Sequence, residues 1–243
     1  MEGITMSNTE ITCEYLADPR VGIMVYRNVL PESLRLVERL EETIGNSTTA
    51  PYKWMEALVG HSEKKPDYRD CVDCKISEPL ARSAPAEFSE ILSIWQDTTE
   101  RLLPCLGHYE QMYNIKMEFM EAINYIRYGV GQHFQTHSDH GFSYTCTVSS
   151  VMYLNDNYEG GELYFPHFQL RFKPEIGDVV LFPSTFIYSH AALEVTKGTK
   201  YSAVTMFDYN DKNHQTGQPS YGAQNTIGIK ATRGVTESRD ASL

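Results

Sequence analysis

Two histidines and one aspartate in the second half of the chain have the types and spacing of metal ligands. His137 and Asp139 are separated by a single residue, and His190 follows later. Side chains at positions i and i+2 of an extended segment lie on the same face, so an imidazole and a carboxylate there can bind one ion. Two histidines and one carboxylate form the facial triad that holds Fe(II) and leaves three coordination positions open. The pattern therefore predicts a metal centre made of His137, Asp139 and His190.

Other residues near this triad have to be weighed against it. His133 precedes it and His140 follows Asp139 at once, but neither has a carboxylate two residues away, so the spacing favours His137. Lys200 follows His190 by ten residues. A cation there would suit a dicarboxylate cosubstrate, because charge-assisted hydrogen bonds to carboxylates are strong. The alternative for Lys200 is an ordinary exposed lysine on a strand.

The segments around these residues have the patterns of short strands. Residues 117–128 are rich in aromatic and β-branched side chains and lack glycine and proline, which is typical of a strand. If Tyr128 points inward, Ile126 and Asn124 do so too, because side chains alternate along a strand. Further strands are expected where turn residues separate apolar runs, over residues 22–29, 145–155, 161–165, 169–172, 178–182, 191–196 and 200–207.

Two segments of the first half have helical periodicity. Residues 31–45 carry apolar side chains at helical spacing, with Pro31 in the first turn and Gly45 at the end. Residues 86–103 form the clearer helix, and Pro104 is expected to end it. Two helices followed by many short strands predict an α+β protein whose strands form a sandwich or a jelly-roll barrel.

Composition limits the classes of function. The chain has 243 residues, 41% of them hydrophobic, and a formal net charge of -11. This charge argues against binding nucleic acid or anionic lipid, since both need surplus lysine and arginine. No secretion signal or apolar run long enough to span a bilayer is visible, which predicts a cytoplasmic protein with no membrane partner. We expect an N-terminal extension at 1–20, one domain at 21–209 and a polar C-terminal tail at 210–243, either mobile or lying across the barrel.

Five cysteines make an odd number, and without a secretion signal a disulfide framework is not expected. Cys71 and Cys74 have the spacing of half a zinc site, for which His61 could supply a third ligand. No second cysteine pair completes such a site. Two ordinary thiols on a loop are therefore the favoured interpretation, with zinc as the alternative.

Several short motifs follow one another in the second half of the chain. They are YGVGQHFQTHSD at 128–139, YLND at 153–156, EGGELYFP at 159–166, PEIGDVVLF at 174–182, His190 and VTKGTKY at 195–201. In this order they resemble the prolyl 4-hydroxylase family of iron(II)- and 2-oxoglutarate-dependent dioxygenases, and the resemblance covers roughly residues 117–208. A family member would have a double-stranded β-helix, or jelly-roll, core with supporting helices before it.

The resemblance also implies roles for particular residues. It makes His137, Asp139 and His190 the iron ligands and Lys200 the partner of the far carboxylate of 2-oxoglutarate. A hydroxyl of Tyr128 or Tyr153 would assist Lys200, and Phe182 would line the cosubstrate pocket. For the two tyrosines, core packing alone is the alternative. The implied cofactors are Fe(II), 2-oxoglutarate and O2, with ascorbate as an accompanying reductant.

The leading functional hypothesis is hydroxylation of prolyl residues in a peptide or protein. A second enzyme hypothesis is hydroxylation of a free amino acid or another small molecule. The hypothesis from a different class is a metal-binding β-helix module without turnover, which is disfavoured because no ligand of the triad is missing. Demethylation of nucleic acids uses related iron chemistry but fits poorly with the net charge.

Overall fold

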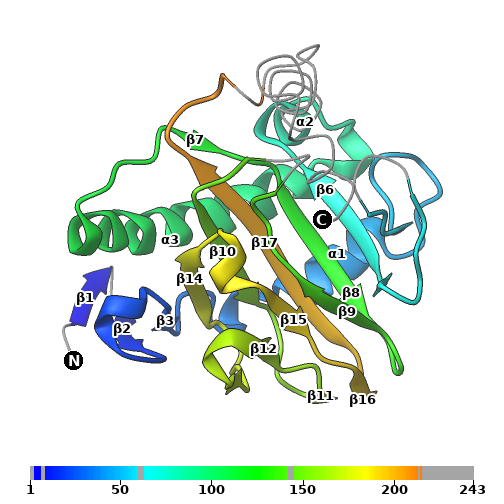
Figure 1. The fold of residues 1–243 in the computed structure, drawn as a ribbon. Coiled ribbons are helices and arrows are strands. Elements are labelled where there is room, and N and C mark those ends of the chain that lie inside the picture. Colours follow the sequence, from blue (N-terminus) through cyan, green and yellow to red (C-terminus); the bar gives the residue numbers. More distant parts are fainter. Residues whose placement is uncertain (1–2, 7–8, 60–62, 142–144, 213, 215–243) are drawn as a thin grey trace, which may run out of the picture.

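The computed structural model describes residues 3–6, 9–59, 63–141, 145–212 and 214 (Figure 1). Most of the expected C-terminal tail at 210–243 lies outside the described residues, as does His61. None of the described helices combines the length and apolar character that crossing a membrane would need.

A large antiparallel sheet is the central element of the domain. Neighbouring strands run in the order β1-β2-β3-β14-β10-β17-β8-β6-β4, and β7 pairs with β17. The strands are β1 (Gly3–Met6), β2 (Thr9–Tyr15), β3 (Met24–Arg27), β4 (Met55–Glu56), β6 (Val72–Ile76), β7 (Phe119–Met120), β8 (Ile123–Tyr128), β10 (Val148–Tyr153), β14 (Val179–Pro183) and β17 (Lys200–Asp208). The segment 1–20, expected as an extension, thus supplies β1 and β2 to one edge of this sheet.

A smaller antiparallel sheet faces the large one across an apolar layer. Its strands, in spatial order, are β13 (Leu170–Phe172), β12 (Leu163–Phe165), β15 (His190–Ala192), β9 (His133–His137) and β5 (Arg69–Asp70). A two-stranded ribbon joins β11 (Glu159–Gly160) to β16 (Val195–Lys197). Side chains such as Val151, Tyr153 and Phe165 fill the space between the sheets. Alternation thus gives strands such as β10, β12 and β14 an inward apolar face, as expected for a jelly roll.

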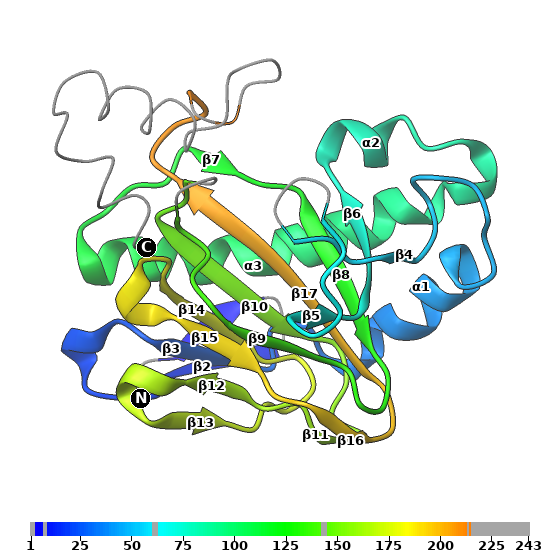
Figure 2. The same cartoon turned by 45° about the vertical axis from the view of Figure 1, so that its right-hand side comes forward.

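Helices cover the other face of the large sheet, as Figures 1 and 2 show. The main ones are α1 (Leu36–Ile44), α2 (Glu78–Arg82) and α3 (Glu90–Tyr113), with short 3-10 turns at Pro19–Val21, Glu32–Leu34, Ala86–Phe88, Pro166–Phe168 and Phe186–Tyr188. Their apolar stripes meet residues such as Met152 and Phe207, which point away from the small sheet. The α+β prediction and the predicted strands are confirmed, with 117–128 divided into β7 and β8 and 191–196 divided between β15 and β16.

The predicted end of the second helix is wrong. Helix α3 runs through Pro104 to Tyr113. Proline removes the hydrogen bond to the carbonyl four residues earlier, but that residue, Glu100, is exposed, so its carbonyl can bind water instead. On the opposite side, Cys105 and Tyr109 continue the buried face, and Tyr109 donates to the Gly22 carbonyl at 2.7 Å. Tertiary packing therefore outweighs the local effect of proline.

Two adjacent leucines of α3 test this packing. Leu102 is fully buried, whereas Leu103 is 48% exposed. We expect Leu102→Ala to lower the free energy of unfolding by about 3 kcal/mol, because it removes buried methyl groups and leaves a cavity. Leu103→Ala is the matched control, with an expected change below about 1 kcal/mol. Urea denaturation of both variants measures the difference, and equal losses would contradict the observed orientation of α3.

Candidate metal and cosubstrate site

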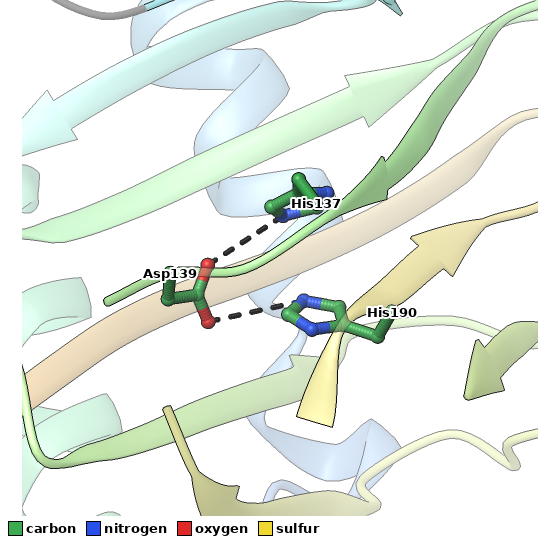
Figure 3. Close-up of side chains that lie close together, drawn as sticks. All are labelled: His137, Asp139 and His190. Carbon is green, nitrogen blue, oxygen red and sulfur yellow. Dashed lines mark ion pairs between the residues drawn. The ribbon is translucent and has the colours of Figure 1, made fainter. Parts of the chain in front are cut away.

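His137, Asp139 and His190 lie close together and point towards one another (Figure 3). His137 is the last residue of β9 and pairs in register with His190, the first residue of β15, while Asp139 lies two residues beyond the end of β9. One ligand atom from each residue lies within 4.8 Å of the others. Asp139 Oδ1 is 3.5 Å from His137 Nε2, and Oδ2 is 3.8 Å from His190 Nε2. The three side chains can therefore bind one ion from one side.

Hydrogen bonds fix which imidazole nitrogen is available. His137 Nδ1 lies 2.8 Å from the Gln135 carbonyl, and His190 Nδ1 lies 3.1 Å from the Tyr188 carbonyl. Carbonyl oxygens only accept, so each Nδ1 carries the proton and each Nε2 keeps its lone pair. Metal-binding histidines are commonly oriented in this way by a backbone acceptor. Both Nε2 atoms face Asp139 and are the donors that a metal would use.

The charges of the site also suit a cation. Burial lowers the pKa of His190 to about 4, so its ring is neutral at pH 7. Burial opposes ionisation of Asp139, but the neighbouring histidines and a hydrogen bond from Ser149 outweigh it and hold the pKa of this carboxyl well below its usual value. One negative carboxylate and neutral imidazoles are the protonation states that coordination requires.

Ser149 is a feature of the site that the sequence analysis missed. Its hydroxyl donates to Asp139 Oδ2 at 2.6 Å and lies 2.8 Å from the hydroxyl of Ser184, and both serines are 1% exposed. The alternation of side chains along β10 could have identified this residue, because it places Ser149 on the same face as Val151 and Tyr153. Ser149 thus holds the carboxylate plane beside the two imidazoles.

Removing this hydroxyl should weaken metal binding without destroying the triad. We expect Ser149→Ala to lower Mn(II) affinity by about 10-fold to 100-fold, since partners that orient metal ligands have effects of this size. Titration calorimetry with Mn(II) measures it, and Ser149→Thr should restore most of the affinity. Thr147→Val is the control, because Thr147 donates a similar bond to Asp208, which is outside the triad. Equal losses in both variants would indicate general destabilisation.

Aromatic stacking orients His137 from the other side. The Phe134 ring is nearly parallel to the His137 ring, at 13° with centroids 3.6 Å apart. The Arg69 guanidinium lies 5.0 Å from the centroid of the same phenyl ring, and Arg69 and Phe134 are register partners on β5 and β9. Arg69 is far from the triad in sequence, and no pattern in the chain connected it to His137.

A cavity of about 120 Å³ extends from the triad between the sheets towards Lys200. Tyr128, Ile126 and Asn124 all line it, which confirms the predicted inward face of β8. Lys200 is 2% exposed, so the alternative of an exposed strand lysine is wrong. Its Nζ donates to the Gly161 carbonyl at 2.7 Å and lies over the rings of Tyr128 and Tyr153, 5.2 and 5.4 Å from their centroids.

The surroundings of Lys200 leave room for an anion. Burial lowers the pKa of Lys200 to about 7, and the hydrogen bond described for it goes to a neutral carbonyl. The Tyr153 hydroxyl is buried and has no hydrogen-bond partner among the described residues. Gly161 has a φ of +66°, and a Cβ there would lie 3.1 Å from Lys200 Cδ, so a glycine permits this close approach. A carboxylate could pair with the ammonium and accept from the tyrosine hydroxyl.

Phe182 lies elsewhere than expected. It is fully buried between the sheets, and its ring is 4.8 Å from that of His190 at 73°. It therefore packs against a triad side chain, while other residues line the cavity. His133 and His140 are outside the metal-binding group: each contacts backbone carbonyls, of Asp67 and Cys146 respectively.

The zinc alternative for Cys71 and Cys74 lacks support from the described residues. The two cysteines pack into different apolar clusters, Cys71 beside Tyr128 and Val195, and Cys74 beside Tyr125 and Met152. Side chains three apart on a strand point to opposite faces. The two thiols therefore do not face one ion.

Comparison with known proteins agrees with this arrangement. Residues 123–208 match the family model described as the 2OG-Fe(II) oxygenase superfamily. This segment is a 2OG-Fe(II) oxygenase domain. It contains β8 to β17, and hence the triad and Lys200. The donor set of the oxygenase domain fits Fe(II), since two imidazoles and a carboxylate are its usual triad, and the buried pair of Lys200 and Tyr153 fits a carboxylate of 2-oxoglutarate.

Curated relatives carry names of the same kind. The chain is 27% identical over 124 residues to "Putative prolyl 4-hydroxylase" of Acanthamoeba polyphaga mimivirus, covering 43% of this chain and 51% of the relative. It is 30% identical over 99 residues to a PKHD-type hydroxylase of Crocosphaera subtropica, covering 37% and 44%. The chain thus spans about half the length of the curated relatives it matches.

Solved structures share the fold over most of the chain. A prolyl hydroxylase from Trichoplax adhaerens, in complex with a hypoxia inducible factor oxygen degradation domain peptide fragment, superimposes with a TM-score of 0.63 at 15% identity, over 82% of this chain and 88% of that one. A 2OG-Fe(II) oxygenase family oxidoreductase from Burkholderia pseudomallei gives 0.55 at 16% identity, over 81% and 90%. The predicted jelly-roll fold of the oxygenase domain is confirmed.

Proposed function

We propose that the protein is an iron(II)- and 2-oxoglutarate-dependent dioxygenase that hydroxylates prolyl residues of a peptide or protein. The observation that carries the proposal is a single cavity with the His137, Asp139 and His190 donors at one end and the buried Lys200 ammonium at the other. The prolyl part is supported by the name of the mimivirus relative, which is a putative prolyl 4-hydroxylase.

Each residue of the cavity has a distinct task in this proposal. His137, Asp139 and His190 hold iron, and Lys200 pairs with the far carboxylate of 2-oxoglutarate while Tyr153 donates to it. When bound, iron and 2-oxoglutarate supply the oxidation, in which O2 and 2-oxoglutarate give a hydroxylated substrate, succinate and carbon dioxide. The protein orients these groups and excludes water with apolar side chains such as Val151 and Val204, which line the cavity.

The partner in this proposal is a proline-containing peptide, not a nucleic acid, in keeping with the net charge of -11. A cytoplasmic location is part of the proposal. It is supported by the five cysteines, which are all buried free thiols.

Incubation with iron(II), ascorbate, 2-oxoglutarate and a library of proline-containing peptides tests the proposal. The expected result is a peptide whose mass increases by one oxygen, with the change located on proline by fragmentation. Product on free proline or another amino acid, with none on peptides, would contradict the peptidyl substrate. No turnover of 2-oxoglutarate with any substrate would instead support a binding module without catalysis.

A further inference from the structure

The end of the cavity near the metal ligands carries polar groups of its own. Asn124 is four residues from Tyr128 on β8, which corresponds to about 13 Å along a strand. Its register partner on β17 is Val204, and Met206, two residues further along, pairs with Ser149, which binds Asp139. Asn124 is therefore displaced from the Lys200 end of the cavity towards the triad.

Asp73 connects Asn124 to Arg69. One carboxylate oxygen, Asp73 Oδ2, accepts from Asn124 Nδ2 at 3.1 Å and from Arg69 Nη2 at 2.9 Å. Asp73 and Asn124 belong to the large sheet and Arg69 to the small one, so the bridge joins the sheets at the side of the cavity. Because an ionised carboxylate only accepts, the NH2 group of Asn124 must face Asp73. This fixes the amide so that Oδ1 points elsewhere.

Two buried polar atoms of this bridge lack hydrogen-bond partners among the described residues. They are the acceptor Asn124 Oδ1 and the donor Arg69 Nε, and both side chains line the cavity. The Cys71 thiol adjoins the guanidinium, but a thiol is only a weak acceptor. An unsatisfied buried polar atom costs about 1–3 kcal/mol. A ligand with one N–H and one carbonyl would satisfy both atoms.

We propose that Asn124 and Arg69 form a subsite for a backbone amide of the peptide substrate. Asn124 Oδ1 accepts the amide N–H, and Arg69 Nε donates to an amide carbonyl. This inference rests on the proposed function, because it assigns substrate recognition in the same cavity. A prolyl residue has no N–H of its own, so the recognised N–H belongs to a neighbouring residue. A free amino acid has no peptide amide, so the subsite selects peptides.

A pair of small probes isolates the amide N–H. N-acetyl-L-proline N′-methylamide carries it, and N-acetyl-L-proline methyl ester has an oxygen in its place. Calorimetric binding to the protein loaded with Mn(II) and 2-oxoglutarate should give about fivefold tighter binding of the amide, since one neutral hydrogen bond contributes about 1 kcal/mol. Equal binding of the two probes, or binding of neither, would overturn the proposal.

Two substitutions separate the roles of the residues. Asn124→Leu removes the acceptor, so the amide and the ester should bind with about equal affinity, and the affinity for the ester should be unchanged. Asn124→Ala should have the same effect. Arg69→Lys keeps a cation opposite Asp73 but removes Nε–H, so both probes should weaken in parallel and the preference should remain. A preference that survives in both Asn124 variants would contradict the subsite. A purely structural role would weaken both probes equally in every variant.

The subsite and the proposed function can fail independently. Oxidation of the amide probe with iron(II), 2-oxoglutarate and O2 is measured separately by mass. Preferential amide binding without any oxidised product from the probe or a peptide would overturn the function and leave the subsite. Oxidised peptide with no preference for the amide probe would overturn the subsite and leave the function.

Discussion

Asp139→Ala is expected to lower Fe(II) and Mn(II) affinity by more than about 100-fold and to reduce 2-oxoglutarate turnover by at least about 1,000-fold. Asp139 carries the negative charge of the triad, and its two oxygens face the Nε2 atoms of His137 and His190. Removing it leaves two imidazoles without a carboxylate, which are poor ligands for a hard divalent ion by themselves. Metal affinity is measured by calorimetry with Mn(II), and turnover by succinate formation.

His133→Ala is the matched control for this prediction. His133 is on the same strand as His137, but its ring nitrogens contact the carbonyls of Gly131 and Asp67. Its loss should leave metal affinity within about twofold of the unaltered protein. If His133→Ala abolished binding while Asp139→Ala retained it, the assignment of the triad would be wrong.

Lys200→Met should raise the KM for 2-oxoglutarate by at least about 100-fold, because truncating one partner of a buried charge pair costs several kcal/mol. Metal affinity should change little, since Lys200 is at the far end of the cavity. Lys197→Met is the control: Lys197 is 75% exposed and binds Glu159 on the ribbon of β11 and β16. Steady-state kinetics with varied 2-oxoglutarate measure both variants, and an unchanged KM in Lys200→Met would contradict the cosubstrate role.

The buried lysine also predicts a dependence on pH. Burial lowers the pKa of Lys200 from 10.5 to about 7, so the unfolded chain binds more protons between these values and stability falls as pH decreases from about 10.5 to about 7. Lys200→Met removes this dependence, so the variant without 2-oxoglutarate should melt at a higher temperature than the unaltered protein at pH 7. Affinity for 2-oxoglutarate should fall as pH rises above 7, because the carboxylate pairs with the protonated amine.

The parts of the site that were predictable lie close together in sequence or follow a strand's alternation. The i, i+2 spacing of His137 and Asp139 indicated a shared ion, and alternation placed Asn124 and Ile126 beside Tyr128. The metal-ligand pattern depends only on residue types and local geometry, so it can be recognised in the sequence without knowledge of the fold.

The remaining parts depend on contacts between distant strands. Arg69 reaches Phe134 only because β5 pairs with β9, and Ser149 reaches Asp139 only because the sheets face each other. Phe182 was expected on the cavity wall, but its ring packs against that of His190, a contact between β14 and β15 that no local pattern predicts. Pro104 predicts a helix end when only the local sequence is considered. The packing of Tyr109, which stabilises α3 beyond the proline, depends on contacts that are distant in sequence.

The central claim, oxidation of a prolyl residue by O2 at the cavity, is tested most directly by isotope incorporation. A peptide substrate, iron(II) and 2-oxoglutarate are incubated under 18O2, and the peptide and succinate are analysed by mass spectrometry. The proposed function predicts one atom of 18O in hydroxyproline and one in succinate, both lost in Asp139→Ala. Peptide that stays unlabelled while succinate accumulates, or label that comes from water, would contradict it.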